Sequence, residues 1–176
     1  MVWTGPITQL CYLVRNVEES ANRWATLMKA GPFFKERSLV PEYSYRGRLV
    51  DVDVTTAMGY CGAMQIELLQ LNDDTPSVFK EGWDARGEGL HHVLIESQDF
   101  DADVARYTAA GCELAQYKQF GSLGRNGFVD AVKFLGFYVE ILQSGPGSQK
   151  MVEIMQTAHR DWDGTDPIRQ MPKIAY

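Results

Sequence analysis

The hydrophobic pattern of the chain begins with a strand followed by a helix. Residues 7–14 form a short apolar run, which is typical of a buried strand. Apolar side chains then recur at helical spacing over residues 17–29. Asn16 and Glu19 have the spacing of a capping box, in which the Asn side chain accepts from a free backbone N–H and the Glu reaches back to the cap. Gly31 is expected to stop this helix.

Two further strands complete this first unit. Residues 49–54 alternate between apolar and polar side chains, and residues 64–71 form another apolar run. Residues 33–45 are rich in aromatic side chains but lack a regular period, and they are predicted to form a rim over a binding pocket. Residues 72–88 are polar and rich in turn residues, which predicts a linker with one short helix around residues 77–80.

The same order of elements then occurs again. Residues 90–96 have the pattern of a strand, and a helix capped by Asp101 and ended by Gly111 follows. Residues 127–134 and 136–143 predict two strands joined by a tight turn. The order strand, helix, strands therefore occurs twice along the chain.

The repeat is visible in the residues as well as in the order of elements. Residues 66–70 (IELLQ) close the first half as residues 139–143 (VEILQ) close the second. Short apolar strands can resemble each other by chance, but here the opening and closing strands match in the same order in both halves. The pattern predicts an α+β fold in which two βαβββ modules pair into a half-open barrel around a central cavity. The predicted boundaries are 1–71 for the first module, 72–88 for the linker, 89–144 for the second module and 145–176 for a C-terminal helical extension.

Composition and charge narrow the range of partners. The chain has 176 residues, of which 45% are hydrophobic and 23% charged, as in ordinary globular domains. Its net charge of −6 and the lack of a Lys/Arg cluster argue against binding to nucleic acid or to an anionic membrane surface. No apolar run approaches the length of a membrane span, and the N-terminus lacks the features of a signal peptide. Cys11, Cys61 and Cys112 form no disulfide framework, which predicts a reducing, cytoplasmic setting.

Four polar side chains occupy equivalent places in the two halves. Gln9 and His92 lie on the opening strands, and Glu67 and Glu140 lie on the closing strands. Burying a carboxylate is costly unless a cation or a hydrogen-bond partner compensates. If both sheets face one cavity, the four side chains converge there and could hold one divalent cation such as Zn, Ni, Co, Mn or Fe. Taken singly, each would be an ordinary strand or core residue, so the prediction depends on their joint placement. His91 is expected to face outward by alternation.

Alternation along the strands also predicts the walls of the cavity. Residues two positions from the candidate ligands share their face, namely Ile7, Cys11, Gln65, Leu69, Leu94, Tyr138 and Leu142. A mostly apolar wall suits a small hydrophobic or aromatic substrate, or a thioester. The chain has no cluster of Arg suited to the carboxylates of glutathione or the phosphates of CoA. In the C-terminal extension, one apolar helical face is expected to pack on the core, formed by Met151, Ile154, Met155 and Ala158.

These same residues carry a resemblance to a known superfamily. The paired module, the GLHHV strand at residues 89–93 and the closing strands IELLQLND and FYVEIL resemble the vicinal oxygen chelate superfamily, and within it the methylmalonyl-CoA epimerase and glyoxalase I branches. The resemblance covers residues 5–143 and implies metal ligands at Gln9, Glu67, His92 and Glu140. The epimerases carry His, Gln, His and Glu in this order, whereas the set found here is similar to that of eukaryotic glyoxalase I.

The resemblance also implies a reaction. Members of the superfamily bind two vicinal oxygens of a substrate on the metal and stabilise the enolate formed when an adjacent C–H is deprotonated. This implies an isomerase, epimerase or lyase with Glu140 as the base. A second base, as in the epimerases, falls on Asp51 with Asp53 as the alternative, unless both are exposed strand residues. Two bases would allow inversion, whereas one would favour isomerisation or elimination.

Two other functions stay open on the same fold. A ring-cleaving dioxygenase needs an iron site with two histidines and a carboxylate, and Gln9 in place of a histidine counts against it. A metal-free protein that sequesters a hydrophobic compound is the other alternative. A homodimer is expected, since the superfamily builds its sites within one chain or across a dimer.

Overall fold

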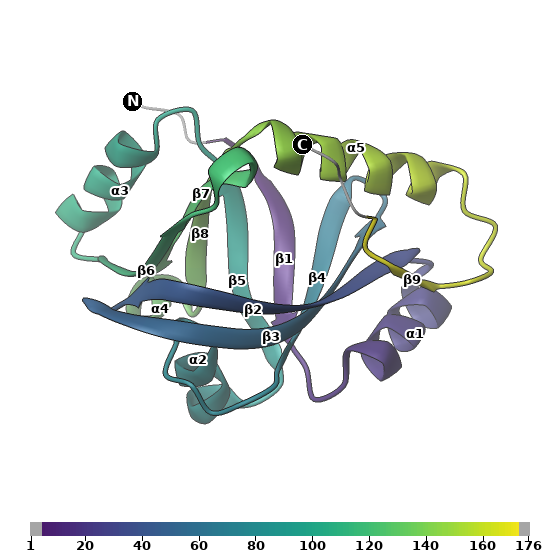
Figure 1. Cartoon of the computed structure of the whole chain (residues 1–176), viewed down its shortest axis with the longest axis horizontal. Helices are drawn as coiled ribbons and strands as arrows, with labels where there is room; N and C mark the ends of the chain where they lie inside the picture. Colours follow the sequence, from purple (N-terminus) through teal and green to yellow (C-terminus); the bar gives the residue numbers. More distant parts are fainter. Residues whose placement is uncertain (1–4, 173–176) are drawn as a thin grey trace.

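One mixed sheet dominates the computed structural model, which describes residues 5–172. The described strands follow the order β3-β4-β1-β5-β8-β7-β6-β2-β9, and β2 also pairs with β3, so that eight of them curl into a barrel (Figure 1). The strands are β1 (Ile7–Leu13), β2 (Phe33–Tyr45), β3 (Arg48–Cys61), β4 (Met64–Leu71), β5 (Gly89–Glu96), β6 (Glu113–Gln119), β7 (Gly124–Asp130), β8 (Tyr138–Ser144) and β9 (Ile168–Gln170). The helices are α1 (Val17–Met28), α2 (Val78–Arg86), α3 (Phe100–Ala109), the 3₁₀ turn η1 (Gly121–Leu123), α4 (Val132–Leu135) and α5 (Pro146–Arg160).

The two predicted βαβββ modules are confirmed. In each module the opening strand pairs in parallel with the closing strand, β1 with β4 and β5 with β8, and β1 and β5 pair antiparallel to join the modules. The registers are equivalent, because Cys11 lies opposite Glu67 as Leu94 lies opposite Glu140. The barrel is closed between β2 and β6 by two residue pairs at the end of β2, and it is half-open elsewhere along this seam.

The predicted irregular stretch at residues 33–45 is instead a regular strand. It pairs with β3 along most of its length, and a register shift between Val40 and Tyr43 marks a bulge in which Glu42 has a φ of 51°. A bulge shifts the side chains beyond it to the opposite face, so the alternation that identifies a strand is interrupted. This is why the sequence pattern of β2 lacks a period.

Other boundaries also differ from the sequence prediction. Strands β6 and β9 were not predicted, β7 ends at Asp130, and the cap of α3 is Asp99, whose side chain accepts from the backbone N–H of Ala102. At α1 the cap is Asn16, which accepts from the backbone N–H groups of Glu18 and Glu19 at 3.0 Å. The side chain of Glu19 pairs with Arg23 on the next turn instead of reaching back.

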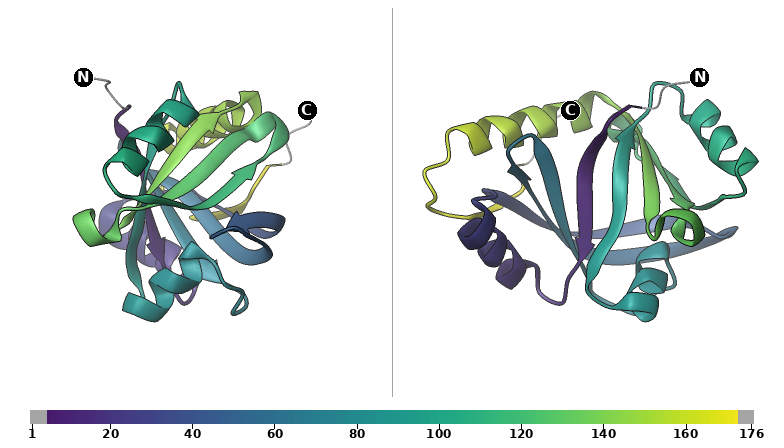
Figure 2. Two further views of the ribbon diagram at one scale, coloured as in Figure 1. Left: turned by 90° about the vertical axis from the view of Figure 1, so that its left-hand side faces the viewer. Right: turned by 180° about the vertical axis from the view of Figure 1, so that it is seen from behind.

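Helix α5 lies along the half-open side of the barrel, at the end opposite α2 (Figures 1 and 2). Met155 is buried against Phe34 and Tyr60, and Met151 and Ala158 pack beside it. The predicted apolar face of the C-terminal extension therefore covers the core. In the described part of the chain, no helix has both the length and the apolar character needed to cross a membrane.

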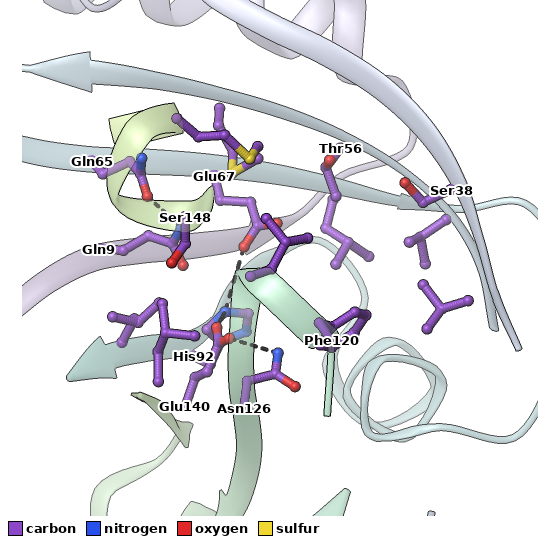
Figure 3. A pocket seen from close by; sticks show the side chains of 18 of the residues that line it. Gln9, Ser38, Thr56, Gln65, Glu67, His92, Phe120, Asn126, Glu140 and Ser148 are labelled. Carbon is purple, nitrogen blue, oxygen red and sulfur yellow. Dashed lines mark hydrogen bonds and ion pairs between the residues drawn. The ribbon is translucent and has the colours of Figure 1, made fainter. Parts of the chain in front are cut away.

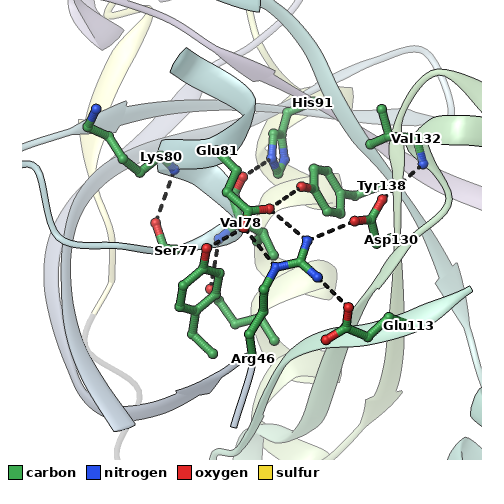
Figure 4. A network of polar contacts seen from close by, with 12 residues as sticks. Arg46, Ser77, Val78, Lys80, Glu81, His91, Glu113, Asp130, Val132 and Tyr138 are labelled. Atoms are coloured by element: carbon green, nitrogen blue, oxygen red, sulfur yellow. Dashed lines mark hydrogen bonds and ion pairs between the residues drawn. The ribbon is translucent and has the colours of Figure 1, made fainter. Parts of the chain in front are cut away.

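Helix α2 is part of the core, although its sequence predicted a linker with a shorter helix. The side chain of Ser77 caps it, accepting from the backbone N–H of Lys80, and the backbone N–H of Val78 donates to Gln116 Oε1 at 3.1 Å. Glu81 accepts from Arg46 Nε at 2.7 Å and from the Tyr138 hydroxyl at 2.7 Å (Figure 4). Buried polar contacts of this kind fix the helix against the barrel.

The Glu81→Gln variant is expected to be less stable than the wild type by about 1–3 kcal/mol at pH 7. Hydrogen bonding to Arg46 lowers the pKa of Glu81 from 4.5 to about 2, against the opposing effect of burial. Because the folded pKa is below the unfolded one, the stabilisation is complete above about pH 4.5 and is lost as the pH falls towards 2. Denaturant unfolding should therefore show the same difference from wild type at pH 7 and pH 5 and a smaller difference at pH 3.

The control for this measurement is Glu113→Gln. Glu113 contacts the same Arg46, but its side chain is 56% exposed, so its loss should change the free energy of unfolding by about 0.5 kcal/mol or less. A Glu81→Gln protein as stable as the wild type at pH 7 would contradict the role given to this network.

Candidate metal centre

The four side chains singled out by the internal repeat meet inside the barrel. Gln9, Glu67, His92 and Glu140 come from β1, β4, β5 and β8, which are neighbours in the sheet (Figure 3). His92 Nε2 lies 3.1 Å from Glu140 Oε2 and 3.5 Å from Glu67 Oε2. His92 is 1% exposed and the Glu67 side chain is 13% exposed. All four belong to one chain, so the site does not need a second subunit to bring them together.

Two polar atoms at this centre, one oxygen and one nitrogen, lack hydrogen-bond partners within residues 5–172. Gln9 Nε2 donates to Gln65 Oε1 at 2.6 Å, which leaves Gln9 Oε1 buried and unpartnered. His92 Nε2 lies within 3.5 Å of both carboxylates but likewise has no hydrogen-bond partner. Buried polar atoms are seldom left unpaired, and an ion is one of the standard explanations. One oxygen and one nitrogen beside two carboxylates are a suitable donor set for a divalent cation.

Cys11 lies directly beside this centre. Its sulfur, a carboxylate oxygen of Glu67 and a ring nitrogen of His92 are all within 4.8 Å of one another, so these three residues could also hold a metal ion. Burial, followed by the charge of Glu67 and a hydrogen bond to it, raises the pKa of the Cys11 thiol well above its usual value. The thiol therefore keeps its proton. The sequence had placed Cys11 only as a wall residue.

The two carboxylates determine the charge of the histidine. Burial lowers the pKa of His92, but interaction with Glu140 and then Glu67 outweighs burial and raises the pKa to about 9. Near neutral pH the ring is therefore protonated between the two carboxylates. A cation at this place would take the position of the proton on Nε2, because a metal-ligating imidazole is neutral.

Glu140 is held by a short hydrogen-bonded chain. Its Oε1 accepts from Asn126 Nδ2 at 2.9 Å, and the Tyr43 hydroxyl donates to Asn126 Oδ1 at 2.8 Å. Burial and then the charge of Glu140 raise the pKa of Tyr43 above its usual range, so the phenol remains a donor. Sequence reasoning missed Tyr43 and Asn126. Tyr43 follows the bulge of β2, where alternation no longer indicates the face.

The centre opens into an apolar cavity of about 270 Å³. Of the predicted wall residues, Gln65, Leu69, Leu94 and Leu142 line it. Cys11 is buried beside the metal centre, Ile7 is 46% exposed, and Tyr138 is directed towards Glu81 and α2. The remaining walls come from β2, β3, α2, β7, α5 and the segment around η1, and include Val40, Val52, Val54, Met58, Phe79, Phe120, Phe128, Met151, Val152 and Met155. No Lys or Arg is among the described lining residues.

The structure places the predicted second base outside the cavity. The cavity-facing residues of β3 include Val52 and Val54, so Asp51 and Asp53 lie on the opposite face. Asp51 is exposed and accepts from the backbone N–H of Glu42 at 2.9 Å. Asp53 accepts from Arg37, which lowers its pKa to about 2. The assignment of Asp51 or Asp53 as a base is therefore corrected, because neither carboxylate can reach a molecule in the cavity.

His91 does not point outward as alternation predicted. It is 0% exposed and packs beneath α2, where its ring stacks on Tyr138 with centroids 4.9 Å apart. The pairing of β1 with β5 shifts register here, because Cys11 lies opposite His92 while Tyr12 lies opposite Leu90. His91 is thus the extra residue of a β-bulge, and bulges re-aim side chains.

Comparisons with known proteins agree with this fold. A family model described as glyoxalase/bleomycin resistance protein/dioxygenase superfamily matches residues 8–128. Methylmalonyl-CoA epimerase from Mycobacterium tuberculosis has a similar structure, with a TM-score of 0.60, 16% identity and coverage of 85% of this chain and 97% of that one. A single-residue variant of methylmalonyl-CoA epimerase from Streptomyces coelicolor, in complex with 2-nitronate-propionyl-CoA, gives a TM-score of 0.59, 21% identity and coverage of 81% and 99%. No curated protein matches the sequence.

Proposed function

Because this chain belongs to the glyoxalase/bleomycin resistance protein/dioxygenase superfamily, we propose that it is a metal-dependent isomerase, epimerase or lyase that removes a proton next to a carbonyl group. The observation that supports this most is the pair of unpartnered atoms, Gln9 Oε1 and His92 Nε2, beside Glu67 and Glu140. These four residues would hold one divalent cation. The cation would supply positive charge next to a substrate carbonyl, which favours loss of a proton from the adjacent carbon.

Glu140 is the proposed base. Asn126 holds Oε1, which fixes the plane of the carboxylate at the edge of the cavity. A base held in one orientation avoids the entropic cost of being ordered during the reaction. With Asp51 outside the cavity, Glu67 is the other acidic residue among the described lining residues. Inversion at carbon by two bases would therefore need Glu67 as the second base, whereas isomerisation or elimination needs only Glu140.

The cavity supports a hydrophobic substrate or the acyl part of a thioester. Its walls are mostly aliphatic and aromatic, with Ser38, Thr56 and Ser148 as isolated polar groups (Figure 3). Such a site binds by excluding water and orients its ligand through a few polar contacts. A ring-cleaving dioxygenase is less well supported, because His92 is the sole histidine among the described lining residues. The homodimer stays a prediction.

Metal analysis and proton exchange test this proposal together. Protein purified without a metal-binding tag and reconstituted is expected to hold about one equivalent of divalent metal. In D₂O, the loaded protein is expected to exchange the acidic C–H of at least one member of a panel of neutral thioesters and ketones, followed by NMR. Tight binding of a hydrophobic probe with neither metal nor exchange would contradict the enzyme and support the sequestration alternative.

A further inference from the structure

Two adjacent histidine rings form a continuous hydrogen-bonded path behind the metal centre. His91 Nδ1 and His92 Nδ1 are 2.8 Å apart. His91 Nε2 lies 2.9 Å from the carbonyl oxygen of Val78, in the first turn of α2 (Figure 4). The bulge at His91 makes this contact possible, since neighbouring side chains on a regular strand face opposite ways. Helix α2 is thereby connected to the candidate metal ligand through one side chain.

The direction of both hydrogen bonds follows from the backbone carbonyl of Val78, which is the acceptor at one end of the path. A backbone carbonyl only accepts, so the proton of this contact is on His91 Nε2. A neutral imidazole has one protonated nitrogen, so His91 Nδ1 must accept and His92 Nδ1 must donate. His91 is 0% exposed, and among the described residues no carboxylate pairs with its ring, so the ring is neutral because a buried charge without a partner is costly. His92 Nε2 is then the nitrogen directed at Glu67 and Glu140.

We infer that His91 is a positioning residue, which holds His92 with its proton on Nδ1 and its Nε2 facing the metal centre, and that the Val78 carbonyl of α2 anchors it. The positioning role rests on the proposed function, because it presupposes that His92 binds a metal. The proton positions themselves do not depend on a bound metal. A metal-ligating histidine commonly donates its other N–H to an acceptor that fixes its tautomer and orientation. Here that acceptor is a second histidine.

The approach of α2 to His91 depends on a glycine. A Cβ added at Gly82 would lie 2.5 Å from Cδ2 and 2.9 Å from Nε2 of His91. Contacts this short require the ring or the helix to move. The Val78 carbonyl is held in place in turn, because the N–H of the same residue donates to Gln116 and Glu81 is bound by Arg46.

Long-range ¹H–¹⁵N NMR of the imidazoles tests the proton positions in the wild-type protein. The expected pattern is His91 protonated on Nε2 and bare on Nδ1, with His92 protonated on Nδ1, in both the metal-free and the Zn²⁺-loaded protein. A proton on His91 Nδ1, or none on His92 Nδ1, would overturn the inference. If the protein binds no Zn²⁺, the proposed function fails, while the metal-free spectrum still decides the arrangement of the two histidines.

Three substitutions test the two ring nitrogens of His91 separately. Asn can place its amide oxygen where Nδ1 accepts, Gln can place its amide nitrogen near Val78 but offers no acceptor to His92, and Phe removes both groups. The Kd for Zn²⁺ is expected to rise by roughly 10- to 100-fold in His91→Gln and His91→Phe. In His91→Asn it should stay much closer to that of the wild type. Gly82→Ala, which touches no ligand directly, should weaken Zn²⁺ binding in the same direction.

Thermal unfolding of the metal-free variants shows whether His91 is only a packing residue. All four variants change a buried contact, so each is expected to unfold at a lower temperature than the wild type. If His91 is a positioning residue, the Zn²⁺ affinity of each variant depends on whether it keeps a hydrogen-bond acceptor in the place of Nδ1. The affinity then does not correlate with the unfolding temperature. Folded His91→Gln and His91→Phe proteins with the wild-type Kd would overturn the inference.

Discussion

The Glu140→Gln variant is expected to lose solvent deuterium exchange by roughly 10²- to 10⁴-fold, the usual contribution of a positioned general base. Gln keeps the shape of the side chain and an oxygen that can accept from Asn126 Nδ2, but it cannot take up a proton. The measurement is the exchange rate of the best substrate of the panel in D₂O, compared at equal metal content. Matching the metal content separates the two roles of Glu140, because the amide oxygen remains a possible ligand.

Glu96→Gln is the matched control for this experiment. Glu96 is a half-buried carboxylate on β5 that bonds to Ser144 and does not line the cavity. Its substitution should leave exchange within about threefold of the wild-type rate, corresponding to less than about 1 kcal/mol in the barrier. Full exchange in Glu140→Gln with bound metal would remove Glu140 as the base. Loss of exchange in Asp51→Asn would contradict the placement of that residue outside the cavity.

The part of the fold that the sequence predicts well is the centre of the sheet. Strands β1, β4, β5 and β8 are largely buried, so each appears as a short, mostly apolar run in which the few polar residues are conspicuous. The internal repeat then aligns those polar residues in pairs. The equivalent registers of β1 with β4 and β5 with β8 account for this success, since equal register puts equivalent residues at equal height in the barrel.

The parts that the sequence does not predict depend on long-range pairing or on bulges. Strand β6 is mostly polar and half-exposed, and it is defined by its pairing with β7. Helix α2 buries few apolar side chains, and polar contacts to Arg46, Gln116 and His91 hold it. Period-based reasoning detects apolar faces and cannot detect such contacts. It therefore placed α2 in a linker and missed Tyr43 and Asn126.

One error in the sequence reasoning has a functional consequence. Strict alternation allowed at most one of His91 and His92 to face the site and made the other, His91, a structural residue that faces away from it. The bulge opposite β1 brings both rings into contact and buries both. The local signal for a bulge is weak in a single sequence, because it requires knowledge of which residues pair across the strands. The adjacent histidines are thus in direct contact, instead of facing opposite sides of the strand as alternation predicted.

The His92→Ala variant is expected to lose metal binding. It removes the nitrogen donor and leaves Glu67 and Glu140 facing each other, so the Kd should rise by more than the roughly 100-fold typical of losing an outer partner of a ligand. A ligand that binds the folded protein and not the unfolded protein raises the free energy of unfolding by about 2.7 kcal/mol when its concentration is 100 times its Kd. The increase in unfolding temperature on adding Zn²⁺ should therefore disappear in this variant.

The control is His159→Ala, which removes the third histidine of the chain. His159 Nδ1 bonds to the carbonyl of Gly31, and its ring packs near Tyr60 away from the metal centre. This variant should unfold at a lower temperature than the wild type, yet gain the same stabilisation from Zn²⁺. The two variants differ in which histidine is lost and not in the number of histidines, so nonspecific binding of Zn²⁺ to imidazole would lower the effect equally in both. Metal content unchanged in His92→Ala would refute a centre built on Gln9, Glu67, His92 and Glu140, because His92 is the sole histidine among the described residues that line the cavity.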